Sequence, residues 1–366
     1  MKNSATSTSS DFSVEIESLR GIAALLVLFG HLYLFGNLAH LFQTASSNTL
    51  NGLIGIVVNP QPPVLLFFTI SGLVLGRQLR KNPVDSLPTF LGYLCRRGFR
   101  LFPLIWVSTI FAVVLQKGNF TDLLNTLLLK DFRFNPVLWS IQVELWCSLF
   151  FPFLFFMFRS SGIFLNVSLF IALTLISFFL KHPLFMQFWV FFHAGLVVDA
   201  LSAKATSRKL NNPLIFILAY LIFILAPEYS IGVRNWMYGC WQSWVLPEIV
   251  ACSLILFFIV HNKKSFINSF LRLSWIRYLG KISFSFYLIH FTLLQLLLVK
   301  YPISSFSYLV VFTLVLIALT VLLSSLTYHL MEAPFNRLGR RINNYIVNDL
   351  FSKPMPDKGD ILMPEI

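Results

Sequence analysis

Successive apolar segments, each about 17 to 25 residues long, run along nearly the whole of this chain of 366 residues. A segment of that length can cross a hydrocarbon core of about 30 Å as a helix, which satisfies its own backbone polar groups. Charged residues make up only 12% of the chain, against about 25% in soluble domains. We therefore predict an all-α, polytopic integral membrane protein with about ten transmembrane helices. The predicted spans lie near residues 18–35, 61–79, 99–116, 137–157, 163–180, 184–201, 213–226, 244–260, 280–299 and 306–330.

Lys and Arg are distributed unevenly between the loops that join these segments. Basic residues concentrate on the cytoplasmic side of membrane proteins. With ten spans and a cytoplasmic N-terminus, the inner loops hold 18 of the 28 basic residues and the outer loops hold 6. The bias predicts that both termini are cytoplasmic. It also accounts for the formal net charge of +13 without a nucleic-acid partner.

The chain divides into one membrane domain with two polar ends. Residues 1–12 form a polar tail, residues 13–341 the membrane domain, and residues 342–366 a polar, Pro-containing tail. The first ten residues do not resemble a secretory signal peptide, so we expect the first span to be retained. Residues 120–130 are too short to span the membrane and are expected to lie along its outer interface as an amphipathic helix.

Two ionisable side chains, Arg20 and His31, lie in the first predicted span. Such groups are unfavourable inside a membrane, so each is a candidate site residue. Eleven helical residues return to within about 20° of the starting direction and rise about 16 Å. One face of this helix therefore carries an arginine near the membrane surface and a histidine about halfway across.

A second basic cluster, Arg96, Arg97 and Arg100, lies at the predicted cytoplasmic start of the third span. These residues are three and four apart, so a helix brings them together. Guanidinium groups bind phosphate through paired hydrogen bonds, although arginines at this position also serve as topology anchors. Arg20 lies at the same membrane face. So does the segment 71–77, which contains Ser71 and Arg77 and has two glycines that would admit a backbone or a ligand.

This arrangement suggests a ligand with phosphates at one end and a reactive group at the other. Coenzyme A has that form: its nucleotide would bind the arginines and its pantetheine arm would carry a thioester towards His31. A neutral imidazole there could accept the proton of an alcohol that attacks the thioester carbonyl.

Six motifs in order along the chain carry a family resemblance. They are Ser18-Leu19-Arg20-Gly21-Ile22-Ala23-Ala24 with His31, Phe67-Phe68-Thr69-Ile70-Ser71-Gly72, Arg96-Arg97-Gly98-Phe99-Arg100-Leu101-Phe102-Pro103, Trp139-Ser140-Ile141-Gln142-Val143-Glu144, Gly280-Lys281-Ile282-Ser283-Phe284-Ser285-Phe286-Tyr287-Leu288-Ile289-His290, and Met331-Glu332-Ala333-Pro334-Phe335. At these residues the chain resembles the acyltransferase family 3 proteins, membrane O-acyltransferases that modify bacterial surface polysaccharides.

The resemblance implies a ten-helix domain that transfers an acyl group, most commonly acetyl, from cytoplasmic acyl-CoA to a hydroxyl of an extracytoplasmic glycan or lipid-linked saccharide. It implies that Arg20, His31, Arg97 and Arg100 are essential. It also implies a bacterial cytoplasmic (inner) membrane with its lipids, no tightly bound cofactor and no metal. The fused periplasmic domain of some relatives does not follow Phe335 here, so a separate periplasmic partner protein could supply its role.

Further polar residues within the spans are candidates for catalysis or acceptor binding. Glu144 needs a buried partner, and either Arg20 or His31 could supply it. Paired with His31, it would orient the ring as the acid of a hydrolase triad does. Its alternative role is a structural hydrogen bond between helices. Other candidates for acceptor binding or support are Ser71, Trp139, Ser140, Ser283, Tyr287, His290 and Glu332.

Three of these residues, Ser283, Tyr287 and His290, are spaced to share one helix face. His290 is either a second functional histidine or a packing residue. Glu332 is expected to pair with an arginine at the cytoplasmic mouth. The sequence assigns no role to His193, Asp199, Glu248 and His329.

Two other classes of function are compatible with parts of the pattern. A polysaccharide or lipid exporter would also have many spans with internal charges, but no repeated halves are visible. A haem-binding electron carrier could use His31, His193, His290 and His329 as ligands, but it leaves the arginines without a role. The cysteines Cys95, Cys147, Cys240 and Cys252 lack metal or redox spacing and are expected to be apolar filler.

Overall fold

The computed structural model is a bundle of helices, and the part of the chain that it describes contains no strand. The described residues are 14–36, 38, 54, 55, 57–160, 163–179, 188–204, 213–225 and 245–350. The helices are α1 (Val14–Phe35), α4 (Gln61–Lys81), α5 (Leu87–Leu115), α6 (Phe120–Leu127), α7 (Leu138–Ser160), α8 (Ile163–Phe179), α9 (Trp189–Lys204), α10 (Pro213–Leu225), α12 (Val245–His261), α13 (Phe266–Leu271), α14 (Ser274–Lys281), α15 (Ser283–Lys300), α16 (Phe306–Thr327) and α17 (Ala333–Tyr345).

Each predicted span coincides with one of these helices. Six helices are long and apolar enough to cross a membrane: α1, α4, α5, α7, α15 and the continuous helix that contains α16. Four shorter apolar helices, α8, α9, α10 and α12, lie at the other four predicted positions. The all-helical membrane class is therefore confirmed. The chain is an integral membrane protein.

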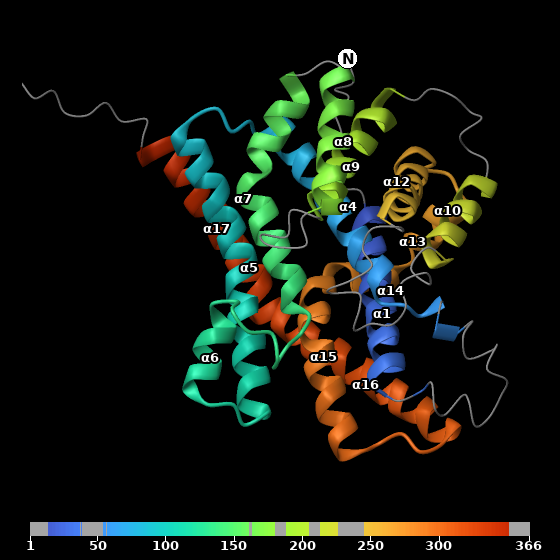
Figure 1. Ribbon diagram of the computed structural model, residues 1–366. Coiled ribbons are helices and arrows are strands. Elements are labelled where there is room, and N and C mark those ends of the chain that lie inside the picture. The colour runs from blue at the N-terminus through green and yellow to red at the C-terminus, as the bar shows by residue number, and fades with distance from the viewer. Residues whose placement is uncertain are drawn as a thin grey trace, which may run out of the picture.

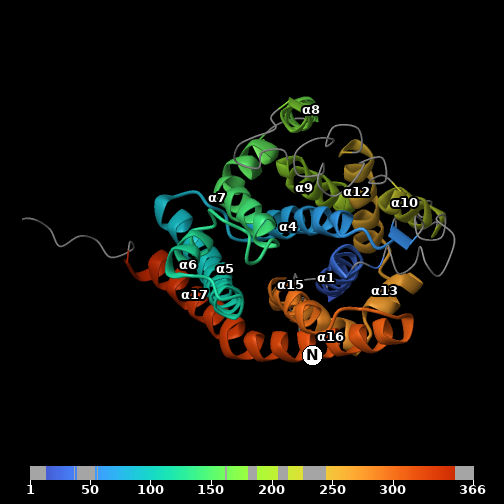
Figure 2. The same ribbon diagram turned by 60° about the horizontal axis from the view of Figure 1, so that its bottom comes forward.

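The helices surround α4, which packs against α1, α7, α9 and α12. Of the most apolar stretch of α4, 72% is buried, against 28% for the stretch that contains α16. Figure 1 shows α5 and α17 side by side at one flank, and in Figure 2 α16 and α17 follow one edge of the bundle. The first helix, α1, packs against both α4 and α15.

The third long helix, α5, begins earlier than the sequence predicted. It starts at Leu87, where the Thr89 hydroxyl accepts a hydrogen bond of 3.0 Å from the Ser86 backbone N–H. The added turns, which precede the predicted span 99–116, are more polar than the span itself. The arginine cluster therefore lies well inside α5, and its side chains are held by a helix that packs along α17.

Glycines allow α4 and α9 to approach closely. A Cβ atom at Gly72 would overlap the backbone carbonyl of Phe192, and one at Gly195 would overlap the backbone carbonyl of Thr69. The glycine pair of α4 was expected to admit either a backbone or a ligand. Gly72 admits the backbone of α9. Gly76 faces the Leu196 side chain of the same neighbouring helix.

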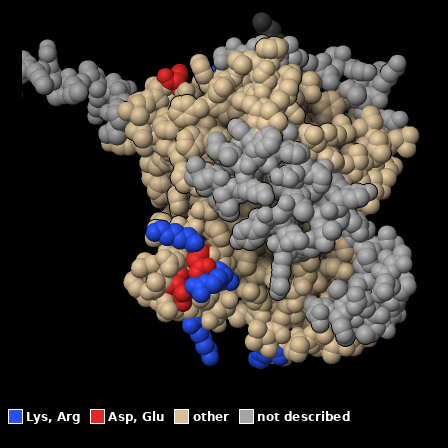
Figure 3. Space-filling view, viewed as in Figure 1, with Lys and Arg blue, Asp and Glu red and all other residues tan. Residues whose placement is uncertain are grey.

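The amphipathic segment after α5 forms a short helix, α6, as the sequence predicted. The Asn119 side chain caps its N-terminus by accepting a hydrogen bond of 2.9 Å from the Asp122 N–H. Its exposed apolar side chains include Phe120 and Leu124, which suits a membrane interface. In Figure 3, charged side chains gather around α6, and a broad band free of charged residues lies above it wherever atoms are not grey.

The helical structure continues beyond residue 341, where the sequence analysis ended the membrane domain. α17 runs to Tyr345, and a π-helical turn continues to Leu350. Gly339 of α17 packs against Phe99 of α5, and the rings of Phe99 and Phe335 stack with centroids 6.3 Å apart. The predicted tail 1–12 lies outside the described residues.

The Gly72→Ala substitution tests the contact between α4 and α9. Because the new methyl group would overlap a backbone carbonyl, we expect the free energy of unfolding to fall by about 1–3 kcal/mol. The matched control is Gly98→Ala, where the added Cβ would meet only the Phe102 ring at 3.6 Å. Thermal or denaturant unfolding of the two variants in detergent measures the difference. Equal stabilities would contradict the close approach.

Candidate active site

A basic cleft lies between the C-terminal end of α4, the first half of α5 and α17. The volume of this cleft, including its open mouth, is about 1280 Å³. Among the described residues, six basic side chains line it, together with neutral polar and apolar residues and no acidic ones: Arg77, Lys81, Arg96, Arg97, Arg100, Arg340, Gln78, Asn82, Asn336, Ile16 and Val74. Four predicted phosphate-binding arginines therefore share one cleft.

One wall of the basic cleft is fixed by ion pairs with Asp199 of α9. Its carboxylate accepts a hydrogen bond of 2.7 Å from Arg77 Nε, and it also contacts Arg80. Asp199 is only 4% exposed, so its charge requires this pairing. The sequence assigned no role to Asp199, and the structure places it as the partner that holds the end of α4 against α9.

The opposite wall contains a buried ion pair between α5 and α7. Arg97 donates hydrogen bonds to the Glu144 carboxylate at 2.9 Å and to the Ser148 hydroxyl at 2.6 Å. The direct partner of Glu144 is therefore Arg97, and not Arg20 or His31 as the sequence suggested, because α5 brings this guanidinium within hydrogen-bond distance of the carboxylate. Glu144 keeps a structural role at the boundary of the basic cleft.

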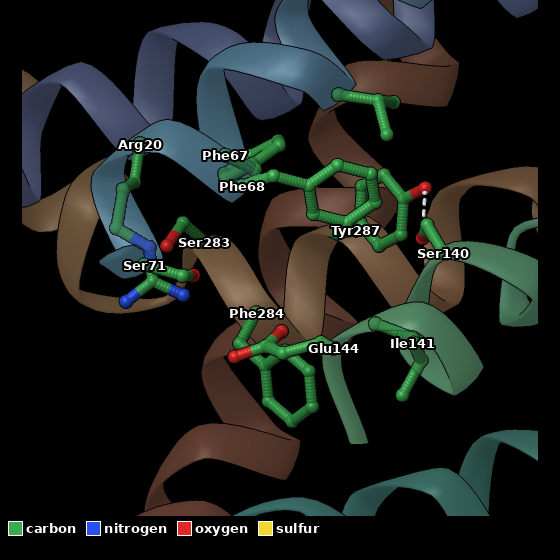
Figure 4. A pocket seen from close by; sticks show the side chains of 11 residues that line it. Arg20, Phe67, Phe68, Ser71, Ser140, Ile141, Glu144, Ser283, Phe284 and Tyr287 are labelled. Carbon is green, nitrogen blue, oxygen red and sulfur yellow. Dashed lines mark hydrogen bonds between the residues drawn. The ribbon is translucent and has the colours of Figure 1, made fainter. Parts of the chain in front are cut away.

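An inner cavity adjoins this ion pair. It is smaller, about 380 Å³ with its mouth, and is lined by α1, α4, α7 and α15: Arg20, Val64, Phe67, Phe68, Ser71, Ser140, Ile141, Glu144, Ser283, Phe284 and Tyr287. Figure 4 shows the Arg20 guanidinium beside Ser71 and Ser283, with Tyr287 and Ser140 at the other end. Since Arg97 lines the cleft and Glu144 lines the cavity, their ion pair separates the two spaces.

The position of Arg20 therefore differs from the predicted one, because Arg20 lines the inner cavity and not the basic cleft. Its Nε is buried, with no hydrogen-bond partner in the part of the chain that the structure describes. At the far end of the cavity, the hydroxyl groups of Ser140 and Tyr287 share a hydrogen bond of 2.7 Å. The cavity thus offers a guanidinium donor at one end and two hydroxyl groups at the other.

His31 lies against His290, one helical turn beyond Tyr287. Nδ1 of His31 and Nε2 of His290 are 2.9 Å apart, and the two ring planes are nearly parallel, with an angle of 6° between them. Nδ1 of His290 lies 2.7 Å from the backbone carbonyl of Tyr287. The predicted shared face of α15 is therefore realised, because Ser283 and Tyr287 line the cavity and His290 contacts the catalytic candidate on α1.

Two other predicted site residues have different surroundings from those expected. Glu332, in the π-helical turn between α16 and α17, accepts a hydrogen bond of 2.8 Å from the Ser285 hydroxyl. Arg100 and Arg20 act on this carboxylate only at longer range, so a direct arginine pair is not its main contact. Trp139 packs against the rings of Phe68 and Phe188 and does not line the cavity.

Several residues of the basic cleft were not predicted from the sequence, notably Lys81 and Arg340. Lys81 ends a span, where a basic residue is expected for topology alone. Arg340 follows the last predicted span, and only the packing of α17 along α5 brings it to the cleft.

Three ionisable residues without a predicted role line neither space. His193 is buried among rings that include Phe158 and Phe170. Glu248 is buried in the first turn of α12. The ring of His329 contacts the edge of Tyr328 in the π-helical turn. Of the predicted filler cysteines, Cys147 and Cys252 are buried, Cys95 is half-buried, and Cys240 lies outside the described residues.

An apolar bundle that encloses a histidine pair, beside a cleft lined with basic side chains, defines a candidate membrane enzyme. A family model described as an acyltransferase domain matches residues 13–329. The chain therefore belongs to this family, acyltransferase family 3, as its motifs indicate, and it is a membrane acyltransferase. No curated protein and no solved structure matches the chain.

The buried ion pair predicts a large loss of stability when one charge is removed. Arg97→Met leaves the Glu144 carboxylate without its partner, so we expect the free energy of unfolding to fall by about 3–5 kcal/mol. The double variant Arg97→Met with Glu144→Met should regain a substantial part of that loss. Unfolding in detergent provides the measurement.

The control is Arg133→Met, which removes exposed ion pairs with Asp122 and Asp131. Solvent already screens these charges, so little change in stability is expected. A double variant no more stable than Arg97→Met alone would contradict the account of Glu144.

Proposed function

We propose that this protein is an O-acyltransferase that moves an acyl group from cytoplasmic acyl-CoA to a hydroxyl of an extracytoplasmic glycan or lipid-linked saccharide. The observation that carries the proposal is the order of three features. The basic cleft, the inner cavity and the histidine pair follow one another along α1, which contributes Ile16, Arg20 and His31 in turn. That order matches the phosphates, the pantetheine arm and the thioester of one acyl-CoA molecule.

The basic cleft supports binding of the nucleotide and its phosphates. Guanidinium groups donate paired, charge-assisted hydrogen bonds to phosphate, and no acidic residue among the described lining side chains opposes an anion. Arg100 and Arg340 lie on different helices, α5 and α17, so phosphates at two positions could be held at once. Arg20, with its Nε unpaired inside the cavity, is placed to bind the donor beyond the phosphates.

His31 is the general base in this proposal. Its imidazole accepts the proton of the acceptor hydroxyl while that oxygen bonds to the thioester carbonyl carbon. The carbon–sulfur bond then breaks, and the CoA sulfur leaves with the proton returned from the imidazolium. The products are the acyl ester and free CoA. Glu144 takes no part in this proton transfer, because Arg97 holds it at the cleft.

The orientation rests on the charge distribution of the loops. The N-terminal end of α1 and the C-terminal end of α4 both border the basic cleft, through Ile16 and Arg77. With the predicted cytoplasmic N-terminus, the cleft opens to the cytoplasm, where acyl-CoA is found. The acceptor then approaches from the outer side. We further propose acetyl as the acyl group and the bacterial cytoplasmic membrane as the location, with a separate periplasmic partner protein where the acceptor requires one.

Transfer of labelled acetyl tests the proposal. Purified protein in liposomes, given [14C]acetyl-CoA and an envelope saccharide extract of its host cells, should produce labelled saccharide. His31→Ala should lower kcat by about 10²- to 10⁴-fold, because the general base is lost. The control His261→Ala removes a histidine that stacks on Phe257 at the end of α12, and it should retain activity. Undiminished transfer by His31→Ala would refute the catalytic role.

A second prediction tests the basic cleft as the phosphate site. Arg340→Ala should raise KM for acetyl-CoA by about 10- to 100-fold, since a charge-assisted hydrogen bond contributes about 1.5–3 kcal/mol. KM for S-acetylpantetheine, which lacks the nucleotide, should not change. The control Arg337→Ala removes an exposed arginine of the same helix that does not line the cleft. An equal effect on both thioesters would place the phosphates elsewhere.

A further inference from the structure

The histidine pair has a hydrogen-bond pattern that fixes where each proton lies. A carbonyl oxygen can only accept, so Nδ1 of His290, 2.7 Å from the Tyr287 carbonyl, carries a hydrogen. In a neutral imidazole the other nitrogen then has a free lone pair. Nε2 of His290 therefore accepts the hydrogen bond of 2.9 Å from His31, whose Nδ1 must be the donor.

The same pattern leaves one nitrogen of His31 ready to accept a proton. With its hydrogen on Nδ1, the neutral His31 ring has its lone pair on Nε2. A general base needs that state, and the wrong tautomer of a catalytic histidine lowers kcat by orders of magnitude in hydrolase triads. We propose that His290 is a positioning residue that holds His31 in the Nδ1–H tautomer and orients its ring. This inference rests on the proposed function.

The surroundings of His290 favour a positioning role over a role as a second base. His290 is fully buried, at 0% exposure. Among the described residues, its ring contacts are Phe286, Tyr287, Phe291 and His31, and none of them is acidic. An imidazolium at that position would be a buried charge without a counter-ion. The proton taken from the acceptor therefore stays on His31, which is only partly buried.

The geometry also argues against two other roles of the pair. A histidine that only fills space needs no hydrogen bond to a titratable neighbour. Both ring nitrogens of His290 are in hydrogen bonds, Nε2 with His31 and Nδ1 with the backbone carbonyl of Tyr287. The two rings cannot be opposite ligands of one haem iron either. Metal–imidazole bonds of about 2 Å would separate their nitrogens by about 4 Å, farther than the observed hydrogen bond.

Three substitutions at His290 separate the two hydrogen bonds. The amide of Gln can place its carbonyl oxygen near the position of Nε2, where it would accept from His31. The shorter amide of Asn reaches only the position of Nδ1. Met has similar bulk but only a weak acceptor. We therefore compare His290→Gln, His290→Asn and His290→Met with the full-length wild type, using the [14C]acetyl-CoA assay in liposomes, and we check folding by size-exclusion chromatography and thermal unfolding.

His290→Gln should keep kcat within about tenfold of the wild type. His290→Asn and His290→Met should lower kcat by about 10²- to 10⁴-fold, as expected for a misdirected tautomer. KM for acetyl-CoA should change by less than about threefold in all three variants, because the basic cleft is intact. If the Met variant fails to fold, the comparison of Asn with Gln carries the result.

Three outcomes would overturn the inference while the wild type remains active. Wild-type kcat in the Asn or Met variant would show that His290 is packing. A Gln variant as inactive as the Met variant would show that His290 itself takes up the proton. A loss confined to KM would place His290 in substrate binding. An inactive wild type would instead contradict the proposed function, so the two failures are distinguishable.

Discussion

The Arg97 guanidinium and the Glu144 carboxylate meet at 2.9 Å inside an apolar bundle, where neither charge could be left alone. Their contact joins α5 to α7 and separates the basic cleft from the inner cavity. On the cleft side, the remaining basic groups face open space suited to phosphate. On the cavity side, most of the lining is apolar or hydroxylic. One neutralised pair therefore allows a strongly positive space and a largely apolar one to adjoin.

Two acidic residues form ion pairs that fix the walls of the cleft, and the cleft still attracts anions. Asp199 is shared by Arg77 and Arg80, and Glu144 is held by Arg97, so both acids lie behind the arginines and not among them. Arg100 and Arg340 then add positive charge from two helices that pack together. A phosphate entering the cleft meets donors whose directions are already set by the helices, which reduces the ordering that binding requires.

Much of the fold could be predicted from the sequence, because lipid exposure imposes a simple rule on helix length and composition. The ten apolar stretches gave the helix positions, and helical periodicity placed Ser283, Tyr287 and His290 on one face. The partners could not be predicted in the same way. Whether Glu144 meets Arg97 or His31 depends on which helices are neighbours, and periodicity within one helix carries no information about that. The same reason explains why Arg340 was missed, since its position follows from the docking of α17.

The pairing of His31 with His290 has a structural cause that lies further along the same two segments. Gly21 of α1 and Gly280 of α14 pack directly together, and a Cβ at Gly21 would lie 2.5 Å from the Gly280 nitrogen. Each glycine precedes its histidine by ten residues. Because α15 follows α14 after the single residue Ile282 and also packs beside α1, the contact of the glycines holds the start of α15 against α1. The glycines of the two motifs thus bring together the two segments that carry the histidines, although neither glycine lines the cleft or the cavity.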